Sequence, residues 1–277
     1  MKILENKSKL DNLLESIKVK KLNVGLIPTM GSIHKGHLSL VNYSKNIGCF
    51  SLATIYINPT QFDDKDDFIN YPKNTQEDIE KLSQSGCDAL YIPTSNEVYP
   101  TGIKSKKTIF EFRNILCDKF RPSHFDGVST VVDSLFNIVK PDFAFFGEKD
   151  FQQLKIIQSM IKTKDLQIKI QACPSVRLNN GMSYSSRYNN FSLDEKNIFN
   201  QVAKKITNSV MSLKKEITLN KIKNLKHDLV TLKIKKIDYI EIRNEKDLKL
   251  TIENHNARLF IAFYIGKIRL IDNFILY

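Results

Sequence analysis

Up to about residue 174, the chain alternates short apolar runs with longer amphipathic segments, and this alternation limits its fold more than any other feature. The apolar runs are rich in β-branched and aromatic residues, and we predict strands at 24–28, 50–57, 89–93, 143–147 and 168–174. Helical periodicity marks the intervening segments 37–47, 75–86, 128–139 and 151–162. Strands that are apolar on both faces and separated by helices form parallel sheets covered on both sides. We therefore expect a doubly wound α/β domain.

The pattern changes after Arg187. Two helical segments precede three consecutive apolar runs, and together they occupy 193–217, 220–234, 237–243, 258–266 and 267–277. Helices followed by consecutive strands indicate a small α+β unit with an antiparallel sheet, and Gly266 with Lys267 is the expected turn of its last hairpin. We expect a first domain at 1–175, a smaller α+β C-terminal domain at 176–277, and a short hinge within 174–187. A chain of 277 residues is long enough to bury a core in each domain.

Composition argues against several classes of protein. The formal net charge is +12 at pH 7, but the lysines are spread along the chain among acidic residues, which favours a solvated basic surface over a nucleic-acid face. No apolar stretch approaches the roughly 18 residues of a membrane span, and the charged first residues lack the apolar centre of a signal peptide. The four cysteines are isolated, which favours buried thiols over a zinc site or disulfides. We expect a cytoplasmic protein that binds neither nucleic acid nor a membrane.

The stretch GLIPTMGSIHKGHLSLV, residues 25–41, joins a predicted strand to a predicted helix and carries His34 and His37. Ligands of doubly wound sheets bind at the carboxyl ends of the strands. Gly31 and Gly36 can let a phosphate approach the backbone, a helix start near Gly36 offers free N–H groups, and both imidazoles can donate to phosphate oxygens. The H-x-G-H spacing leaves both rings on one side of the turn. A capping or core role is possible for either ring alone, but the pair indicates a phosphate-binding loop.

Further polar stretches fall at corresponding strand ends. INPTQF supplies Asn58 and Gln61, whose amides could hydrogen-bond a small polar substrate. FFGEKDFQQL supplies Lys149 to neutralise phosphate and Asp150 to accept from a ribose hydroxyl or to hold Mg²⁺ indirectly. YSSR, residues 184–187, adds two hydroxyls and a guanidinium. Each stretch alone could be a surface turn or a solvated cap, but together they indicate a nucleotide site.

Four longer motifs follow one another between residues 28 and 187: PTMGSIHKGHLSLV, IYINPTQF, RPSHFDGVSTVVDSLFNIVKPDFAFFGEKDFQQL and SVRLNNGMSYSSR. In sequence and order they resemble the motifs of the pantothenate synthetase (pantoate:beta-alanine ligase) family within the H-x-G-H nucleotidyltransferase superfamily. IEIR and RLIDN near the end of the chain suit the C-terminal domain of that family. The resemblance implies a Rossmann-like first domain, ATP as a substrate with Mg²⁺, and a homodimer.

The resemblance also implies a two-step reaction. Pantoate attacks the α-phosphate of ATP to give pantoyl adenylate and pyrophosphate, and the amine of beta-alanine then displaces AMP to form pantothenate. His37 is the implied proton donor, and His34, Lys149, Arg187 and Mg²⁺ are the groups able to neutralise charge on the α-phosphate. Of these, the expected catalytic residues are His37, His34 and Lys149. No protein nucleophile is required.

The same resemblance assigns binding residues. Gln61 is implied to hold pantoate and later beta-alanine, Gln153 to hold pantoate, and Asn58 is expected to contact substrate beside Gln61. The implied ATP contacts are Met30, Gly31, Ser32, Ile33, His34, Lys35, Gly36, His37, Gly147, Glu148, Lys149, Asp150, the backbone of Val176, Tyr184, Ser185, Ser186 and Arg187. The direct metal ligands stay open.

Three positions depart from the family pattern. Lys35 stands where the family commonly has Glu, and Tyr184 and Tyr188 stand where Met and Asn are usual. Two other classes share the H-x-G-H signature or its fold: an RNA-binding aminoacyl-tRNA synthetase relative, and a nucleotide-binding module without activity. The first would be expected to carry an anticodon domain and a clustered basic stripe, and the second to have lost Lys149 or one histidine.

Overall fold

The computed structural model describes residues 1–63 and 65–277, with the backbone alone at residues 65, 67 and 189. The chain forms two compact units. The first comprises Met1–Asn114, Arg121–Glu148 and Gln152–Pro174, and the second comprises Ile115–Phe120, Lys149–Phe151 and Ser175–Tyr277. Two short segments from the first part of the sequence therefore belong to the second unit. The predicted domain boundary between residues 175 and 176 stays a prediction.

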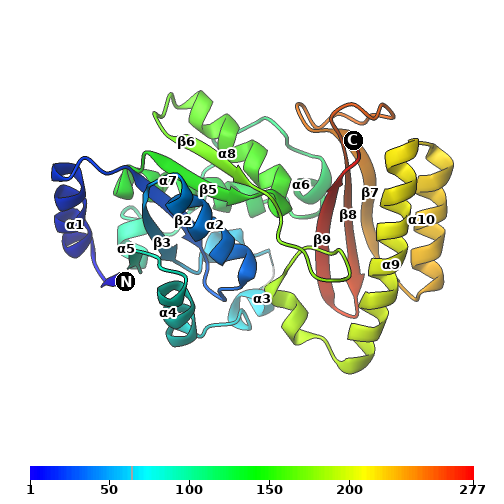
Figure 1. Cartoon of the computed structure of the whole chain (residues 1–277), viewed down its shortest axis with the longest axis horizontal. Coiled ribbons are helices and arrows are strands. Elements are labelled where there is room, and N and C mark those ends of the chain that lie inside the picture. Colours follow the sequence, from blue (N-terminus) through cyan, green and yellow to red (C-terminus); the bar gives the residue numbers. More distant parts are fainter. Residues whose placement is uncertain (64) are drawn as a thin grey trace. The chain divides into compact units, whose positions relative to one another are not determined.

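The first unit contains a six-stranded sheet whose strand pairs are all parallel (Figure 1). Its strands are β1 (Lys2–Leu4), β2 (Val24–Thr29), β3 (Phe50–Ile55), β4 (Ala89–Tyr91), β5 (Phe143–Gly147) and β6 (Lys169–Cys173). The spatial order is β1-β4-β3-β2-β5-β6, so the chain builds outward from β2 first on one side and then on the other. This confirms the predicted doubly wound sheet. Its topological switch point lies between β2 and β5, where such sheets bind ligands.

Helices flank this sheet. They are α1 (Lys7–Val19), α2 (Lys35–Asn46), α3 (Lys65–Ile69), α4 (Thr75–Gln84), α5 (Ser95–Val98), α7 (His124–Val139) and α8 (Phe151–Thr163), with short 3-10 turns η1 (Pro59–Gln61) and η2 (Glu148–Asp150). Ile27, Ala53 and Phe145 come from three adjacent strands and share one buried cluster with Leu40 and Val41 of α2. Side chains from three adjacent strands thus pack against α2, and the helix begins after a short loop that follows β2.

The sequence patterns did not predict β1 or α1. The three residues of β1 are too few to show a period, and the strand is fixed by parallel pairing with β4, Lys2 opposite Ala89. α1 buries only Leu10, Leu13 and Ile17 along a mostly polar helix. Both elements therefore depend on contacts with distant residues.

The second unit contains an antiparallel sheet of β7 (Ile237–Asn244), β8 (Ala257–Ile265) and β9 (Ile268–Ile275) in that order. Its helices are α6 (Leu116–Phe120), α9 (Leu193–Lys215) and α10 (Leu219–Thr231), with η3 (Ser186–Asn190) before α9. α9 and α10 lie side by side next to the sheet in Figure 1, and Val202 and Ile206 share a buried cluster with Leu259. The predicted α+β unit is confirmed, as is the two-residue hairpin turn, where Gly266 adopts φ +56°.

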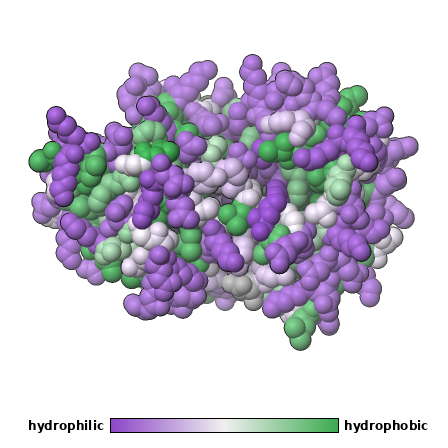
Figure 2. Space-filling view, viewed as in Figure 1, coloured by the Kyte–Doolittle hydropathy of each residue, from purple (hydrophilic) through white to green (hydrophobic). Residues whose placement is uncertain are grey.

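The surface and the cysteines agree with the composition. In the view of Figure 2, hydrophilic residues cover most of the surface and hydrophobic ones form small scattered groups. Among the described residues, no helix combines the length and the apolarity that crossing a membrane requires. The predicted burial of the cysteines is confirmed for Cys49, Cys87, Cys117 and Cys173.

Candidate active site

The loop between β2 and α2 is fixed at its start by Thr29. The Thr29 hydroxyl donates to the backbone oxygen of Thr54 over 2.7 Å and accepts from the Gly31 N–H over 3.1 Å. Gly31 and Ser32 then adopt positive φ angles of 82° and 52°, a conformation that turns the chain sharply. The loop therefore leaves the sheet at the carboxyl end of β2, beside the switch point.

Asp78 of α4 holds the middle of this loop. Its side chain is buried, and its two oxygens accept from the backbone N–H groups of Ser32 at 2.8 Å and Ile33 at 2.6 Å. From the next turn of the same helix, Lys81 Nζ donates to the Ile33 oxygen over 3.0 Å. Sequence reasoning missed both residues, because no local pattern links a helix to a loop 45 residues away.

His34 and His37 lie on one side of the turn, as predicted. Their rings stack with centroids 4.0 Å apart and planes 20° from parallel. They also cap α2 reciprocally: His34 Nδ1 accepts from the Gly36 N–H over 3.1 Å, and His37 Nδ1 accepts from the His34 N–H over 3.4 Å. A nitrogen that accepts from a backbone N–H carries no proton, so in each neutral ring the proton is on Nε2. Capping therefore sets both imidazoles as Nε2 donors.

The two site glycines differ in their surroundings. A Cβ on Gly36 would lie 2.9 Å from His34 Cε1, so the small residue makes room for the capping ring. A Cβ on Gly147, at the end of β5, would meet no atom within 4 Å. Since neither packing nor positive φ demands glycine at 147, its bare backbone suits a ligand that approaches closely.

Gln61 and Asn58 lie together after β3. Gln61 is buried in η1, and its Oε1 accepts from Asn58 Nδ2 over 3.0 Å. Asn58 is completely buried, and its side chain also contacts Thr60, Tyr99 and Gly127. This geometry favours support of Gln61 over the direct substrate contact that the sequence suggested for Asn58.

Two adjacent glutamines in the first turn of α8 differ in their contacts. Gln152 is buried and its Nε2 donates to the Phe112 oxygen over 2.8 Å. Gln153 is half-buried, and within 1–63 and 65–277 its side chain has no hydrogen-bond partner. Gln153 is therefore the glutamine whose amide has no partner among the described residues, and the pantoate contact expected of it stays a prediction.

In the second unit, Lys149 and Asp150 follow Gly147 and Glu148 directly in the chain. Lys149 Nζ lies 3.7 Å from Asp150 Oδ1, and both side chains are partly exposed. The backbone oxygen of Lys149 accepts from Asn273 Nδ2 over 2.9 Å. The ammonium is thus held near a carboxylate while its backbone is fixed by β9.

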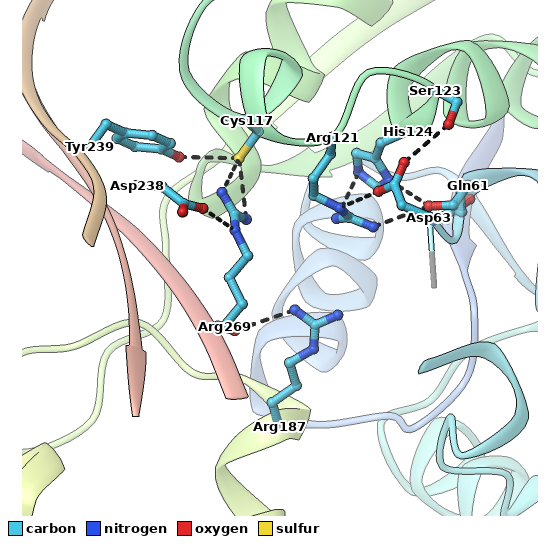
Figure 3. A network of polar contacts seen from close by, with 10 residues as sticks. All are labelled: Gln61, Asp63, Cys117, Arg121, Ser123, His124, Arg187, Asp238, Tyr239 and Arg269. Atoms are coloured by element: carbon cyan, nitrogen blue, oxygen red, sulfur yellow. Dashed lines mark hydrogen bonds and ion pairs between the residues drawn. The ribbon is translucent and has the colours of Figure 1, made fainter. Parts of the chain in front are cut away.

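The 175–187 stretch supplies the other candidate contacts of this unit. The Val176 oxygen accepts from the Tyr184 N–H over 2.9 Å, and Ser185 precedes η3, which carries Ser186 and Arg187. Arg187 donates to the Arg269 backbone oxygen over 3.3 Å (Figure 3). These contacts fix the stretch on itself and on β9 of the same unit.

The donor set suits a metal that arrives with its ligand. In the part of the chain that the structure describes, no group of three or more His, Cys, Asp or Glu residues could hold a metal ion. Mg²⁺ commonly keeps several waters and binds through substrate phosphates and one or two carboxylates. Asp150, with a side chain 46% exposed, is a carboxylate able to take that part.

The structure thus brings the predicted residues into two groups. In the first unit lie Met30 to His37, Asn58, Gln61, Gly147, Glu148 and Gln153, and in the second lie Lys149, Asp150, Val176 and Tyr184 to Arg187. The fold and the first group define a doubly wound α/β protein with a glycine- and histidine-bearing loop at its switch point.

Comparison with known proteins identifies the family. Residues 2–275 match the family described as pantoate-beta-alanine ligase. The chain is 39% identical to the pantothenate synthetase of Wigglesworthia glossinidia brevipalpis over 99% of this chain and 98% of that protein. It is 36% identical to that of Acetivibrio thermocellus over 99% of each. The chain belongs to the pantoate–beta-alanine ligase family.

Solved structures agree. Pantothenate synthetase from Thermus thermophilus superposes with a TM-score of 0.89 at 28% identity, over 100% of both chains. Pantoate-beta-alanine ligase from Francisella tularensis, complexed with beta-gamma ATP and beta-alanine, superposes with a TM-score of 0.85 at 33% identity, over 100% of this chain and 98% of that chain. The fold is therefore that of the family along the whole chain.

Proposed function

We propose that this chain condenses pantoate with beta-alanine to form pantothenate, and that it does so through pantoyl adenylate with release of pyrophosphate and AMP. The observation that carries the proposal is the stacked His34–His37 pair, capped so that each Nε2 is a donor, at the carboxyl end of β2. Membership of the family and the beta-gamma ATP and beta-alanine bound in the Francisella relative support it.

In the first step, a carboxylate oxygen of pantoate attacks the α-phosphorus of ATP, and the bond from that phosphorus to the bridging oxygen of pyrophosphate breaks. Negative charge grows on the α-phosphate oxygens as the carboxylate adds. The Nε2–H groups of His34 and His37 donate to these oxygens, and the Lys149 ammonium adds a positive charge. Mg²⁺ bound with the triphosphate would supply further charge neutralisation, with Asp150 as the protein carboxylate that would hold it.

In the second step, the amine of beta-alanine attacks the acyl carbon of pantoyl adenylate. The bond from that carbon to the bridging oxygen breaks, the oxygen leaves with AMP, and the nitrogen releases a proton to solvent to give the amide. Gln61 and Gln153 hold the pantoyl part, and Gln61 also contacts beta-alanine in the second step, because their amides suit the oxygens of these substrates and carry no charge that would compete with the reacting groups.

The homodimer that the resemblance implies and the cytoplasmic location that the composition indicates belong to the same proposal. Sedimentation at micromolar protein should show a species of about twice the chain mass of 32.0 kDa. A monomer alone would contradict the dimer and leave the proposed reaction unaffected.

The proposed reaction is tested by incubating the purified protein with ATP, Mg²⁺, D-pantoate and beta-alanine. We expect AMP, pyrophosphate and pantothenate in equal amounts, with no product when pantoate is left out. ADP with inorganic phosphate would contradict adenylation. AMP that forms only with tRNA would favour the synthetase relative, and no turnover with tight ATP binding would favour the inactive module.

A further inference from the structure

The motif RPSHFDG, residues 121–127, belongs to the longest motif in the sequence, and none of the roles assigned above uses it. We infer that this segment is a positioning device for Gln61, which fixes the backbone and the amide orientation of that residue. The inference rests on the proposed function, in which Gln61 contacts pantoate. It assigns the motif no substrate contact of its own.

Two side chains of the motif hold the backbone of Gln61. Its carbonyl oxygen accepts from Arg121 NH2 over 3.1 Å and lies 2.8 Å from His124 Nδ1 (Figure 3). A carbonyl oxygen can only accept, so His124 carries its proton on Nδ1. The Nε2 of the neutral ring is then an acceptor, and it lies 3.4 Å from Arg121 NH1. The two side chains thus support each other as well as the loop.

The positive charge of Arg121 is paired with a carboxylate of the protein. Its Nε lies 2.9 Å from Asp63 Oδ2, and Ser123 donates to the other oxygen of that carboxylate over 3.0 Å. The Arg121 side chain is only 18% exposed. A guanidinium that is paired and mostly covered has little charge left for a substrate, so Arg121 acts here as a clamp on the Gln61–Asp63 loop.

Gly127 sets how closely α7 approaches η1. A Cβ at this position would lie 2.4 Å from the Thr60 oxygen and 2.7 Å from the Gln61 nitrogen, and both are backbone atoms that cannot rotate away. The Gly127 oxygen also accepts from Asn58 Nδ2 over 3.1 Å. Any other residue at 127 would displace η1 and with it Gln61.

The same contacts fix which way the Gln61 amide points. The Thr60 N–H donates to Asn58 Oδ1, and the Gly127 oxygen accepts from Asn58 Nδ2, so the orientation of the Asn58 amide is unambiguous. Asn58 Nδ2 therefore faces Oε1 of Gln61, and Gln61 Nε2 points the other way. Among the described residues this Nε2 has no hydrogen-bond partner. Gln61 is thus prepared to donate, which suits the carboxylate of pantoate.

Histidine variants at 124 test the inference. Asn places an amide donor where Nδ1 stands and Ala does not, so His124→Ala should raise KM for pantoate about tenfold, the effect of one lost hydrogen bond, and His124→Asn should restore most of it. KM for ATP should change by less than about twofold. His227→Ala, an exposed histidine of α10, is the control and should change neither constant.

The decisive measurement repeats His124→Ala in a Gln61→Ala background. If His124 acts through Gln61, the second substitution adds less than about twofold to the KM for pantoate. Full additivity, or equal changes in both KM values, would overturn the inference while pantothenate formation still supports the proposed function. Should His124→Ala fail to fold, Arg121→Lys replaces it, since Lys keeps the charge but cannot bind Asp63 and Gln61 together. A wild-type protein that forms no pantothenate would overturn both proposals.

Discussion

The side-chain amide of Asn273 donates to the backbone oxygen of Lys149 over 2.9 Å, within the second unit. The preceding residue, Asp272, is buried on the same strand and accepts from the backbone and the hydroxyl of Ser183 at 2.7 and 2.6 Å. Two consecutive residues of β9 therefore hold both stretches of this unit that carry candidate ATP contacts. The RLIDN motif therefore fixes two separate stretches of the unit, which its sequence alone did not reveal.

Asn273→Asp tests this role. Aspartate still accepts from Arg258, but it cannot donate to the Lys149 oxygen, so we expect kcat/KM for ATP to fall about tenfold, as for one lost hydrogen bond. Asn254→Asp is a matched control, because Asn254 also donates to a lysine backbone oxygen, that of Lys214 at the end of α9. Equal losses in the two variants, measured by steady-state kinetics, would show that Asn273 has no special link to ATP.

His37 can be tested with its capping and donor roles separated. Asparagine places an acceptor where Nδ1 stands and so keeps the cap, but it lacks the Nε2–H. We expect His37→Asn to melt near the wild-type temperature and to lose about 10²-fold in pantoate-dependent exchange of pyrophosphate into ATP. His37→Gln, which reaches the Nε2 position, should recover part of that rate. Near-normal exchange by His37→Asn would show that His37 is not a catalytic residue.

Asp78→Asn should show that the loop position matters for catalysis. Asparagine can accept only one of the two N–H groups of Ser32 and Ile33, and its own amide hydrogens face the other. We expect a loss of about 1 to 3 kcal/mol in the free energy of unfolding and a lower kcat. Glu80→Gln, on the exposed side of the same helix, is the control. A destabilised variant with unchanged kcat and KM would limit Asp78 to stability.

The ionisation of Tyr99 should lower the free energy of unfolding at alkaline pH. Burial raises the pKa of Tyr99 to about 12, whereas the unfolded chain loses this proton near the ordinary tyrosine value of about 10. The contribution of Tyr99 to the free energy of unfolding is fully present below pH 10. It is lost between pH 10 and 12, because the tyrosine of the unfolded chain releases its proton first. We expect Tyr99→Phe to flatten the fall in unfolding free energy over this range, measured by urea titration. An equal slope in the wild type and the variant would contradict the expected contribution.

The central part of the fold was predictable because its signals are local. The strands β2 to β6 lie in short, mainly apolar runs, and the helices between the runs repeat with a clear period, so type and order follow from neighbouring residues. β1 was missed because a strand of three residues has no period, and its pairing with β4 joins Leu4 to Tyr91, which are far apart in the sequence. α1 was missed because it buries only three side chains of a mostly polar helix. The segments Ile115–Phe120 and Lys149–Phe151 join the second unit for the same kind of reason.

The residues of the candidate site also differ in how far the sequence could predict them. His34 and His37 were predictable since both lie in one motif at a strand end. Asp78 was not, because a carboxylate that accepts from distant backbone groups leaves no trace in spacing. Gly127 shows the same limit: its motif could be recognised, but the reason for glycine is the backbone of Thr60, which only the packing of α7 on η1 brings close.

Transfer of oxygen from pantoate tests the proposed chemistry most directly. Pantoate labelled with ¹⁸O in both carboxylate oxygens is incubated with the protein, ATP, Mg²⁺ and beta-alanine, and the products are weighed by mass spectrometry. Attack by the carboxylate on the α-phosphorus, followed by cleavage of the acyl carbon–oxygen bond, predicts AMP with one ¹⁸O and pantothenate with one ¹⁸O in its amide carbonyl. Label in inorganic phosphate with formation of ADP, or unlabelled AMP beside pantothenate, would contradict the adenylate route.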